Sequence, residues 1–202
     1  MSKLNTENKL FEIMGNLGDM IILNLLFVIC CIPIVTIGAA QTAMYQVMMR
    51  RVRKESIYAA REFLQGFKNE FKKSIKLWIF FLITAIILIF DVLYIGKSWN
   101  VIGVGVGCLI FIWIILFSYV FPLEARFDNT SVNTLKNAMF MSVRHFPYTI
   151  AVIVLNSIPI LAFVAGGAIE GLLTPIFLVV GFSLIARTNS IIFEKIFANY
   201  GG

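Results

Sequence analysis

Long stretches of this chain contain almost no charged side chains, and the basic residues gather between them. Four stretches hold at most one Asp, Glu, Lys or Arg: residues 20–49, 77–95, 101–121 and 146–169. The one exception is Asp91, and nine of the 17 Lys and Arg residues lie within residues 50–76. A lipid bilayer excludes charge, whereas the loops on its cytoplasmic side collect Lys and Arg. The pattern therefore predicts an all-α, polytopic helical membrane protein.

Six membrane helices, paired as three hairpins in a single integral membrane domain, are predicted from these stretches. A spanning helix needs about 20 mostly apolar residues. The predicted helices are residues 17–32, 38–53, 75–95, 100–121, 147–165 and 171–187. The turns of the second and third hairpins are expected at residues 96–100 and 166–171, which contain glycine.

The first hairpin depends on a break at Pro33. Residues 20–49 in one helix would be about 45 Å long, against an apolar bilayer core of about 30 Å. A proline removes one helix hydrogen bond and disfavours helical geometry in the residue before it. Thr36 or Gly38 can then begin the second helix. Without the break the chain would have five spans, and this topology stays open as the alternative.

The distribution of Lys and Arg predicts how the chain is oriented in a cell membrane. Residues 50–76 and 122–147 carry most of the basic side chains, whereas the two tight turns carry one lysine in total. The first two segments are therefore predicted to be cytoplasmic and the turns external. Six helices place both termini in the cytoplasm, and five would leave the N-terminus outside.

Two cytoplasmic amphipathic helices are predicted, at residues 56–73 and 131–145. In the first, Phe63, Phe67 and Phe71 recur at intervals of four residues, with lysines between them. An apolar stripe with interleaved lysines is typical of a helix that lies among lipid headgroups. Packing of the stripe against the ends of the membrane helices is an equally good interpretation.

The two amphipathic segments align when the sequence is shifted by 75 residues. The aligned pairs include Ser56 with Ser131, Phe71 with Phe146, and Ser74 with Thr149. Ser131 is also expected to cap its helix. Each half of the chain would then consist of a membrane helix, a basic exit, an amphipathic helix and an external hairpin, which is a repeat arrangement familiar in membrane proteins.

Few side chains in the predicted spans could form a binding site. Asp91 is the only acid well inside a span, and such a group is a functional candidate, although one helical turn would bring it to the headgroups. Gln41 and Asn156, together with Asn24, are the best uncharged polar candidates. Hydrogen bonding between helices is the simpler interpretation of these amides, and a path for a solute is the more specific one.

No catalytic constellation is recognisable in the sequence. His145 is the only histidine, and neither His-Glu-x-x-His nor Gly-x-Ser-x-Gly occurs. Glu124 is expected to pair locally with Arg126. We therefore predict that the protein is not an enzyme and uses no metal or cofactor. The net charge of +6 is explained by attraction to anionic lipid rather than to nucleic acid, because the basic residues flank the apolar spans.

Several motifs in the first 75 residues resemble the YesL-like family, also described as domain of unknown function 624. They are CIPIVTIGAA at 31–40, AMY at 43–45, RVRKE at 51–55 and FxxxFKxxFKK at 63–73. Pro33, Thr36 and Gly38 belong to the first motif. The family usually has a proline after the Thr-x-Gly, where this chain has Ala39.

The resemblance implies a small multi-pass membrane protein of Firmicutes-type bacteria whose molecular activity is undefined. Such proteins are often encoded beside carbohydrate transporters of the ATP-binding cassette (ABC) type. An accessory component of carbohydrate uptake is therefore expected, with the bilayer and the permease subunits of an ABC transporter as partners. An independent small-solute transporter is the alternative.

Overall fold

The structure, a computed structural model, describes residues 2–95 and 101–201, and every regular element in this part of the chain is a helix. The main helices are α1 (Ser2–Cys31), α2 (Ile37–Val52), α3 (Ala59–Ile95), α4 (Val101–Arg126), α5 (Ser131–Arg144), α6 (Phe146–Ala165), α7 (Gly167–Ile176) and α8 (Phe182–Phe197). A π-helical turn, Phe177–Gly181, joins α7 to α8. The predicted external turn at 96–100 lies outside the described residues.

Five helical segments are long and apolar enough to cross a membrane. They are Met14–Cys31, Ala59–Tyr94, Ile102–Arg126, Phe146–Val164 and Glu170–Tyr200. The predicted all-α, polytopic membrane fold is confirmed. The remaining predicted membrane helix is α2, whose 16 residues make about 24 Å of helix. Ten of those residues are buried, because α2 packs against α1, α3, α4 and α8 in the middle of the bundle.

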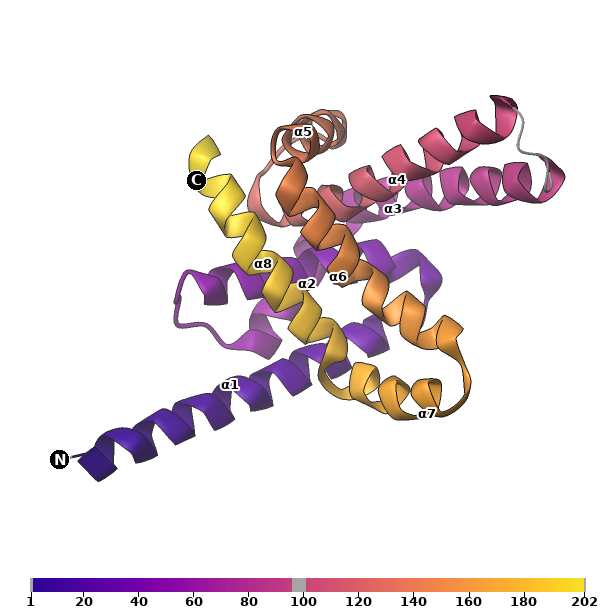
Figure 1. Cartoon of the computed structure of the whole chain (residues 1–202). Helices are drawn as coiled ribbons and strands as arrows, with labels where there is room; N and C mark the ends of the chain where they lie inside the picture. Colours follow the sequence, from indigo (N-terminus) through magenta and orange to yellow (C-terminus); the bar gives the residue numbers. More distant parts are fainter. Residues whose placement is uncertain (1, 96–100, 202) are drawn as a thin grey trace.

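The helices form three hairpins that leave one end of the bundle and return to it (Figure 1). Ion pairs connect the returning ends: Arg51 of α2 pairs with Asp19 of α1, and Glu194 of α8 lies 2.5 Å from Arg53 and 3.8 Å from Arg126. The two chain ends and the α2–α3 linker lie on this side, while the far ends of α3 and α4 and the α6–α7 junction lie on the other. We call the first side the basic end.

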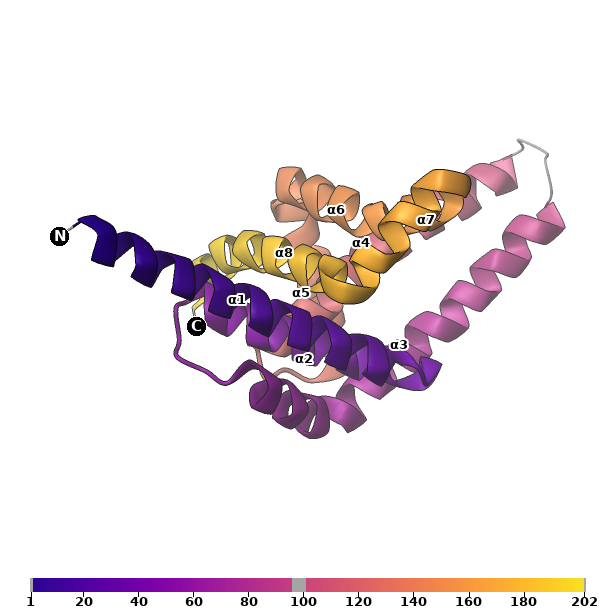
Figure 2. The same cartoon turned by 90° about the horizontal axis from the view of Figure 1, so that it is seen from below.

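Helix α3 corrects the sequence prediction of two separate helices at 56–73 and 75–95. Its 37 residues form one continuous helix, about 55 Å long (Figure 2). The composition changes from amphipathic to apolar near Ser74, but no proline or glycine interrupts the backbone there. A change from amphipathic to apolar composition does not by itself end a helix, and α3 therefore continues without a break.

The second half of the chain does break at the equivalent place. Helix α5 ends before His145, and Pro147 lies in the first turn of α6. Pro147 aligns with Lys72 under the 75-residue shift, so a proline in one half explains why only that half is divided. Both aligned hydroxyls contact a hydroxyl of another helix: Ser74 Oγ lies 3.0 Å from Thr42 Oγ1 of α2, and Thr149 Oγ1 lies 2.7 Å from the hydroxyl of Tyr119 of α4.

The break between α1 and α2 lies where Pro33 predicted it. Helix α1 ends at Cys31 and α2 begins at Ile37. The hydroxyl of Thr36 donates to the carbonyl of Cys30 over 2.5 Å and to that of Pro33 over 2.7 Å. Thr36 thus supplies a donor to the last turn of α1 and makes no side-chain cap bond to α2.

The phenylalanine stripe of α3 packs inward. Phe63 is fully buried, and Phe67 packs against the core. The Phe67 ring stacks on that of Phe63 and meets that of Phe71 edge-on, with ring centroids 6.4 and 5.4 Å apart. Of the two interpretations left open by the sequence, packing on the ends of the membrane helices describes this stripe.

Helix α5 has the opposite arrangement. Thr130, rather than Ser131, caps it by accepting from the backbone N–H of Asn133 over 3.4 Å. The buried residues of α5 are Thr134, Ala138, Met141 and Ser142. All of these except Met141 are small or polar. The exposed large apolar side chains of α5 are Val132, Met139, Phe140 and Val143. An apolar surface of this kind meets lipid or another protein.

Asn24 of α1 is inserted into the backbone of the α7–α8 helix. Its side-chain amide donates to the carbonyls of Phe177 and Leu178 over 2.9 and 2.7 Å, and its oxygen accepts the N–H of Ser183 over 2.9 Å. A group that enters the backbone ladder explains why this helix has a π-helical turn here. The predicted role of Asn24 in hydrogen bonding between helices is confirmed.

Replacing Asn24 by leucine is expected to destabilise the contact between α1 and α8. Three hydrogen bonds are lost, and at about 0.6 kcal/mol each in a membrane protein the sum is about 2 kcal/mol. The measurement is the thermal midpoint of the purified protein in a neutral detergent, with Asn133→Leu, an exposed site on α5, as control. An unchanged midpoint for Asn24→Leu would contradict the assigned role.

The linker after α2 is held by Glu55. Arg50 Nε donates to Glu55 over 2.6 Å, and Arg53 approaches the other carboxylate oxygen to 2.8 Å. The hydrogen bond from Arg50, reinforced by Arg53, outweighs the effect of burial and holds the pKa of Glu55 below its ordinary value. The folded protein therefore binds a proton at Glu55 less readily than the unfolded chain does.

The linkage predicts a pH-dependent effect of Glu55→Gln. A carboxyl with a lowered folded-state pKa stabilises the fold above its unfolded pKa, about 4.3, and this contribution is lost as the pH falls through the folded value. The difference in thermal midpoint between the natural protein and the variant should therefore be largest near pH 6–7. It should disappear in acid, and a difference independent of pH would contradict the account.

Candidate functional site

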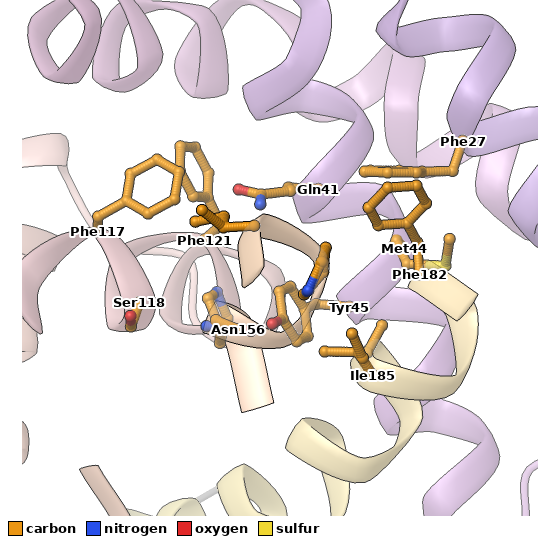
Figure 3. Close-up of a pocket in the computed structure, with 14 residues that line it drawn as sticks. Phe27, Gln41, Met44, Tyr45, Phe117, Ser118, Phe121, Asn156, Phe182 and Ile185 are labelled. Carbon is orange, nitrogen blue, oxygen red and sulfur yellow. The ribbon is translucent and has the colours of Figure 1, made fainter. Parts of the chain in front are cut away.

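A cavity of about 220 Å³ lies inside the bundle, surrounded by α1, α2, α4, α6 and α8 (Figure 3). Most of its wall is aromatic or aliphatic: Phe27, Phe117, Phe121 and Phe182 contribute rings. Polar groups come from Gln41, Tyr45, Ser118 and Asn156, and none of the described lining residues is charged. Apolar walls with a few converging polar groups are typical of small-molecule sites.

Helix α2 presents two of these polar side chains. Gln41 and Tyr45 are four residues apart and therefore lie on one face of the helix. The buried position of α2 directs this face into the protein rather than toward lipid.

Prolines inside two helices also line the cavity. Pro122 of α4 and Pro159 of α6 each lack the N–H that would bond to the carbonyl four residues earlier. For Pro122 that carbonyl belongs to Ser118, which lines the same cavity. Pro122 thus leaves a backbone acceptor without its usual helix bond at the wall formed by α4.

A network of side-chain amides connects the cavity to α8. The Nδ2 of Asn189 donates to Asn156 Oδ1 over 2.8 Å and to the hydroxyl of Tyr45 over 3.2 Å. Asn189 is fully buried. Asn189 is not among the predicted site residues because the last predicted helix ends at residue 187, whereas α8 continues to Phe197. The helical spacing of Ala186, Asn189 and Phe193 on one buried face is the signal that would have revealed it.

Gln41 has an unused hydrogen-bond acceptor. Its Oε1 atom is buried and has no partner in the described part of the chain. Leaving a buried acceptor unpaired costs about 1–3 kcal/mol, so such groups are expected mainly where a ligand or water completes them. The cavity can therefore receive a small neutral molecule that donates a hydrogen bond.

The predicted polar set is divided by the structure. Gln41 and Asn156 line one cavity, as the interpretation as a solute site requires. Asp91 does not, because it lies near the far end of α3, which projects away from the middle of the bundle (Figure 1). Asp91 is therefore not part of the candidate site.

A buried carboxylate lies on the other side of α2. Glu124 of α4 is only 3% exposed, and its Oε2 lies 2.9 Å from Ser74 Oγ and 3.2 Å from Thr42 Oγ1, which donate to it. The two hydroxyls are 3.0 Å apart, so three oxygens from three helices form a triangle. The Oε1 atom of Glu124 is buried and has no partner among the described residues.

The expected pairing of Glu124 with Arg126 is wrong. Side chains two residues apart in a helix point in different directions, and Arg126 instead approaches Glu194 of α8. A carboxylate buried in a membrane helix is a functional candidate by default. Within residues 2–95 and 101–201, no group of three His, Cys, Asp or Glu side chains lies together in a way that could hold a metal ion.

Comparison with known proteins gives a match over the first part of this architecture. No curated protein and no solved structure matches the chain. The motifs at 31–40, 43–45, 51–55 and 63–73, which carry the resemblance noted in the sequence, all lie in the stretch that does match. Over residues 20–92, which extend from α1 through α2 into α3, the chain is similar to the family described as "Protein of unknown function, DUF624".

Proposed function

We propose that this protein is a non-enzymatic, multi-pass component of the cell membrane that works with an ABC-type carbohydrate uptake system and binds a small neutral solute in its cavity. The observation that carries the proposal is the buried, unpaired Oε1 of Gln41 in an uncharged, aromatic-lined cavity. Hydroxyl groups of a sugar can donate to amide oxygens, and its apolar face can lie against aromatic rings. The resemblance to YesL-like proteins supports carbohydrate as the class.

The basic end faces the cytoplasm in this proposal, and both chain ends lie on that side. Arg50, Arg51 and Arg53 gather there, which agrees with the tendency of cytoplasmic segments to carry Lys and Arg. Epitope tags at either terminus, tested for protease access in sealed right-side-out vesicles, should both be protected.

Helix α5 supplies the surface for a permease subunit. Its exposed apolar stripe is formed by Val132, Met139, Phe140 and Val143, while its buried side chains, Met141 excepted, are small or polar. Turning the apolar side outward leaves it free to pack against another membrane protein.

Crosslinking in native membranes tests this partnership. A photoreactive amino acid at Val143 should crosslink to a permease subunit, whereas the same group at Leu109, an exposed apolar site on α4 away from α5, should react only with lipid. Equal capture at both positions, or no protein adduct at Val143, would contradict the proposed partnership.

An independent small-solute carrier is the second candidate. Its support is the cavity itself, whose walls include two proline-containing helices and the α8 helix with its π-helical turn, since interrupted helices mark many transporter sites. Reconstituted liposomes should then take up solute without any partner. Flux should fall in Gln41→Leu but not in Asp91→Asn, because Asp91 does not line the cavity. No flux across a broad panel of sugars would eliminate this candidate.

A further inference from the structure

A second and larger cleft opens at the basic end of the bundle. It has a volume of about 640 Å³ and lies between α1, the end of α2, the α2–α3 linker and α8. Its size falls within the range of about 300–1,000 Å³ usual for small-molecule sites. None of the groups in the central cavity lines it.

The cleft is positively charged. Arg51, Lys54 and Arg187 line it, against one carboxylate, Glu55. Glu55 forms ion pairs with Arg50 and Arg53, which largely compensate its negative charge.

Two of the cations have unused hydrogen-bonding capacity. Arg51 pairs with Asp19, but its Nε is buried without an acceptor in the described part of the chain. Arg187 donates to the sulfur of Met20 over 3.4 Å, a weak acceptor, and the described residues place no carboxylate within ion-pair distance of it.

Lys54 occupies a position that favours glycine. Its φ is 60°, and the bonds from Lys54 N–H to the Arg51 carbonyl and from Glu55 N–H to the Arg50 carbonyl form the usual C-terminal helix motif. Glycine adopts this geometry without the strain that a side chain brings. A lysine in left-handed geometry, with its side chain at a cleft, is a candidate for a functional charge.

The surroundings favour a lipid over a soluble anion. Met20, Met48 and Ile191 form apolar walls of the cleft. Just beyond it, Leu17 on α1 and Leu184 on α8 are exposed on helices that cross the membrane. An acyl chain can lie along these helices while the phosphate enters the cleft.

We propose that this cleft binds the phosphate of an anionic phospholipid headgroup through Arg51, Lys54 and Arg187. Guanidinium groups bind phosphate through paired hydrogen bonds, and ammonium groups bind it as point charges. Basic pockets between membrane helices are suited to such headgroups. The site is independent of any solute in the central cavity.

Titration of short-chain phosphatidylglycerol and phosphatidylcholine into the purified full-length protein in neutral detergent tests the proposal. Phosphatidylglycerol should bind at least fivefold more tightly. Lys54→Gly and Arg187→Gln should each weaken that binding about fivefold, the ratio that corresponds to about 1 kcal/mol per basic residue. Lys136→Gln, which removes an exposed charge on α5, should leave it unchanged.

Lys54→Gly also separates binding from folding. Glycine relieves the left-handed geometry, so this variant should melt at a temperature equal to or above that of the natural protein while binding the lipid less well. Equal affinity for both lipids, or affinity unaffected by both substitutions, would overturn the proposal. Binding of glycerol 3-phosphate as tightly as of phosphatidylglycerol would overturn the lipid assignment in favour of a soluble phosphate compound.

Discussion

Glu124→Gln is expected to raise the thermal stability of the protein. The carboxylate is buried among helices, and its Oε1 has no partner within the described residues. Keeping an ionised group in such a place costs free energy that two hydroxyl donors only partly offset. Glutamine retains a carbonyl oxygen for Thr42 and Ser74 and removes the charge. The gain should be on the order of 1 kcal/mol at neutral pH, because the charge is removed while the hydrogen bonds from both hydroxyls are kept.

The thermal midpoint in neutral detergent measures this effect, and a double-mutant cycle with Thr42→Val gives its origin. Hydrogen bonds to charged groups contribute about 1.5–3 kcal/mol, so Thr42→Val should be costly in the natural protein and much less so in Glu124→Gln. A midpoint that falls by a comparable amount in Glu124→Gln would mean that the carboxylate serves the fold. Natural proteins retain destabilising groups mainly at functional sites. A thermal midpoint that rises in Glu124→Gln would therefore identify Glu124 as a functional residue.

Gly38→Ala is expected to force α2 and α3 apart. A methyl group at Gly38 would lie 2.6 Å from Cβ of Trp78 and 3.0 Å from the backbone carbonyl oxygen of Ser74. Neither atom is at the end of a flexible side chain, so relief requires movement of a helix. Overpacking of this kind costs about 1–3 kcal/mol. Because Thr42 lies one turn from Gly38, the same movement would disturb the oxygen triangle at Glu124.

Gly107→Ala is the matched control for this substitution. Gly107 is also a helical glycine within an apolar segment, but apart from its chain neighbours and its own helix backbone no described atom lies within 4 Å of where its methyl group would be. Alanine has the higher helix propensity, so this variant should be neutral or slightly more stable. The comparison uses thermal midpoints under identical conditions, and equal midpoints for the two variants would contradict the close contact assigned to Gly38.

Hydropathy and charge were sufficient to locate most of the helices. The break after Cys31 follows from Pro33, and the outer limits of the apolar segments follow from the charged residues beside them. The predicted division of α3 is wrong, because the change in composition near Ser74 is not accompanied by a break in the helix. Only the second half of the chain has a proline, Pro147, at the equivalent point.

The contacts that define the candidate sites depend on tertiary structure. Asn24 bonds to backbone groups more than 150 residues away, at a π-helical turn that no local pattern marks. Glu124 lies beside Thr42 and Ser74 because three helices meet, whereas its neighbours in the sequence indicated Arg126. Gln41 and Asn156 could be recognised as polar groups in apolar segments, but their meeting around one cavity could not.

Binding of neutral sugars to the purified protein in lipid nanodiscs tests the central claim most directly. A panel of neutral monosaccharides and disaccharides should include at least one that binds, and Gln41→Leu should weaken that binding at least tenfold, because the ligand loses the buried amide oxygen. Gln65→Leu, at an exposed site on α3, should leave it unchanged. Sugar affinity that is the same in Gln41→Leu and in the natural protein, or no binding across the panel, would contradict the account.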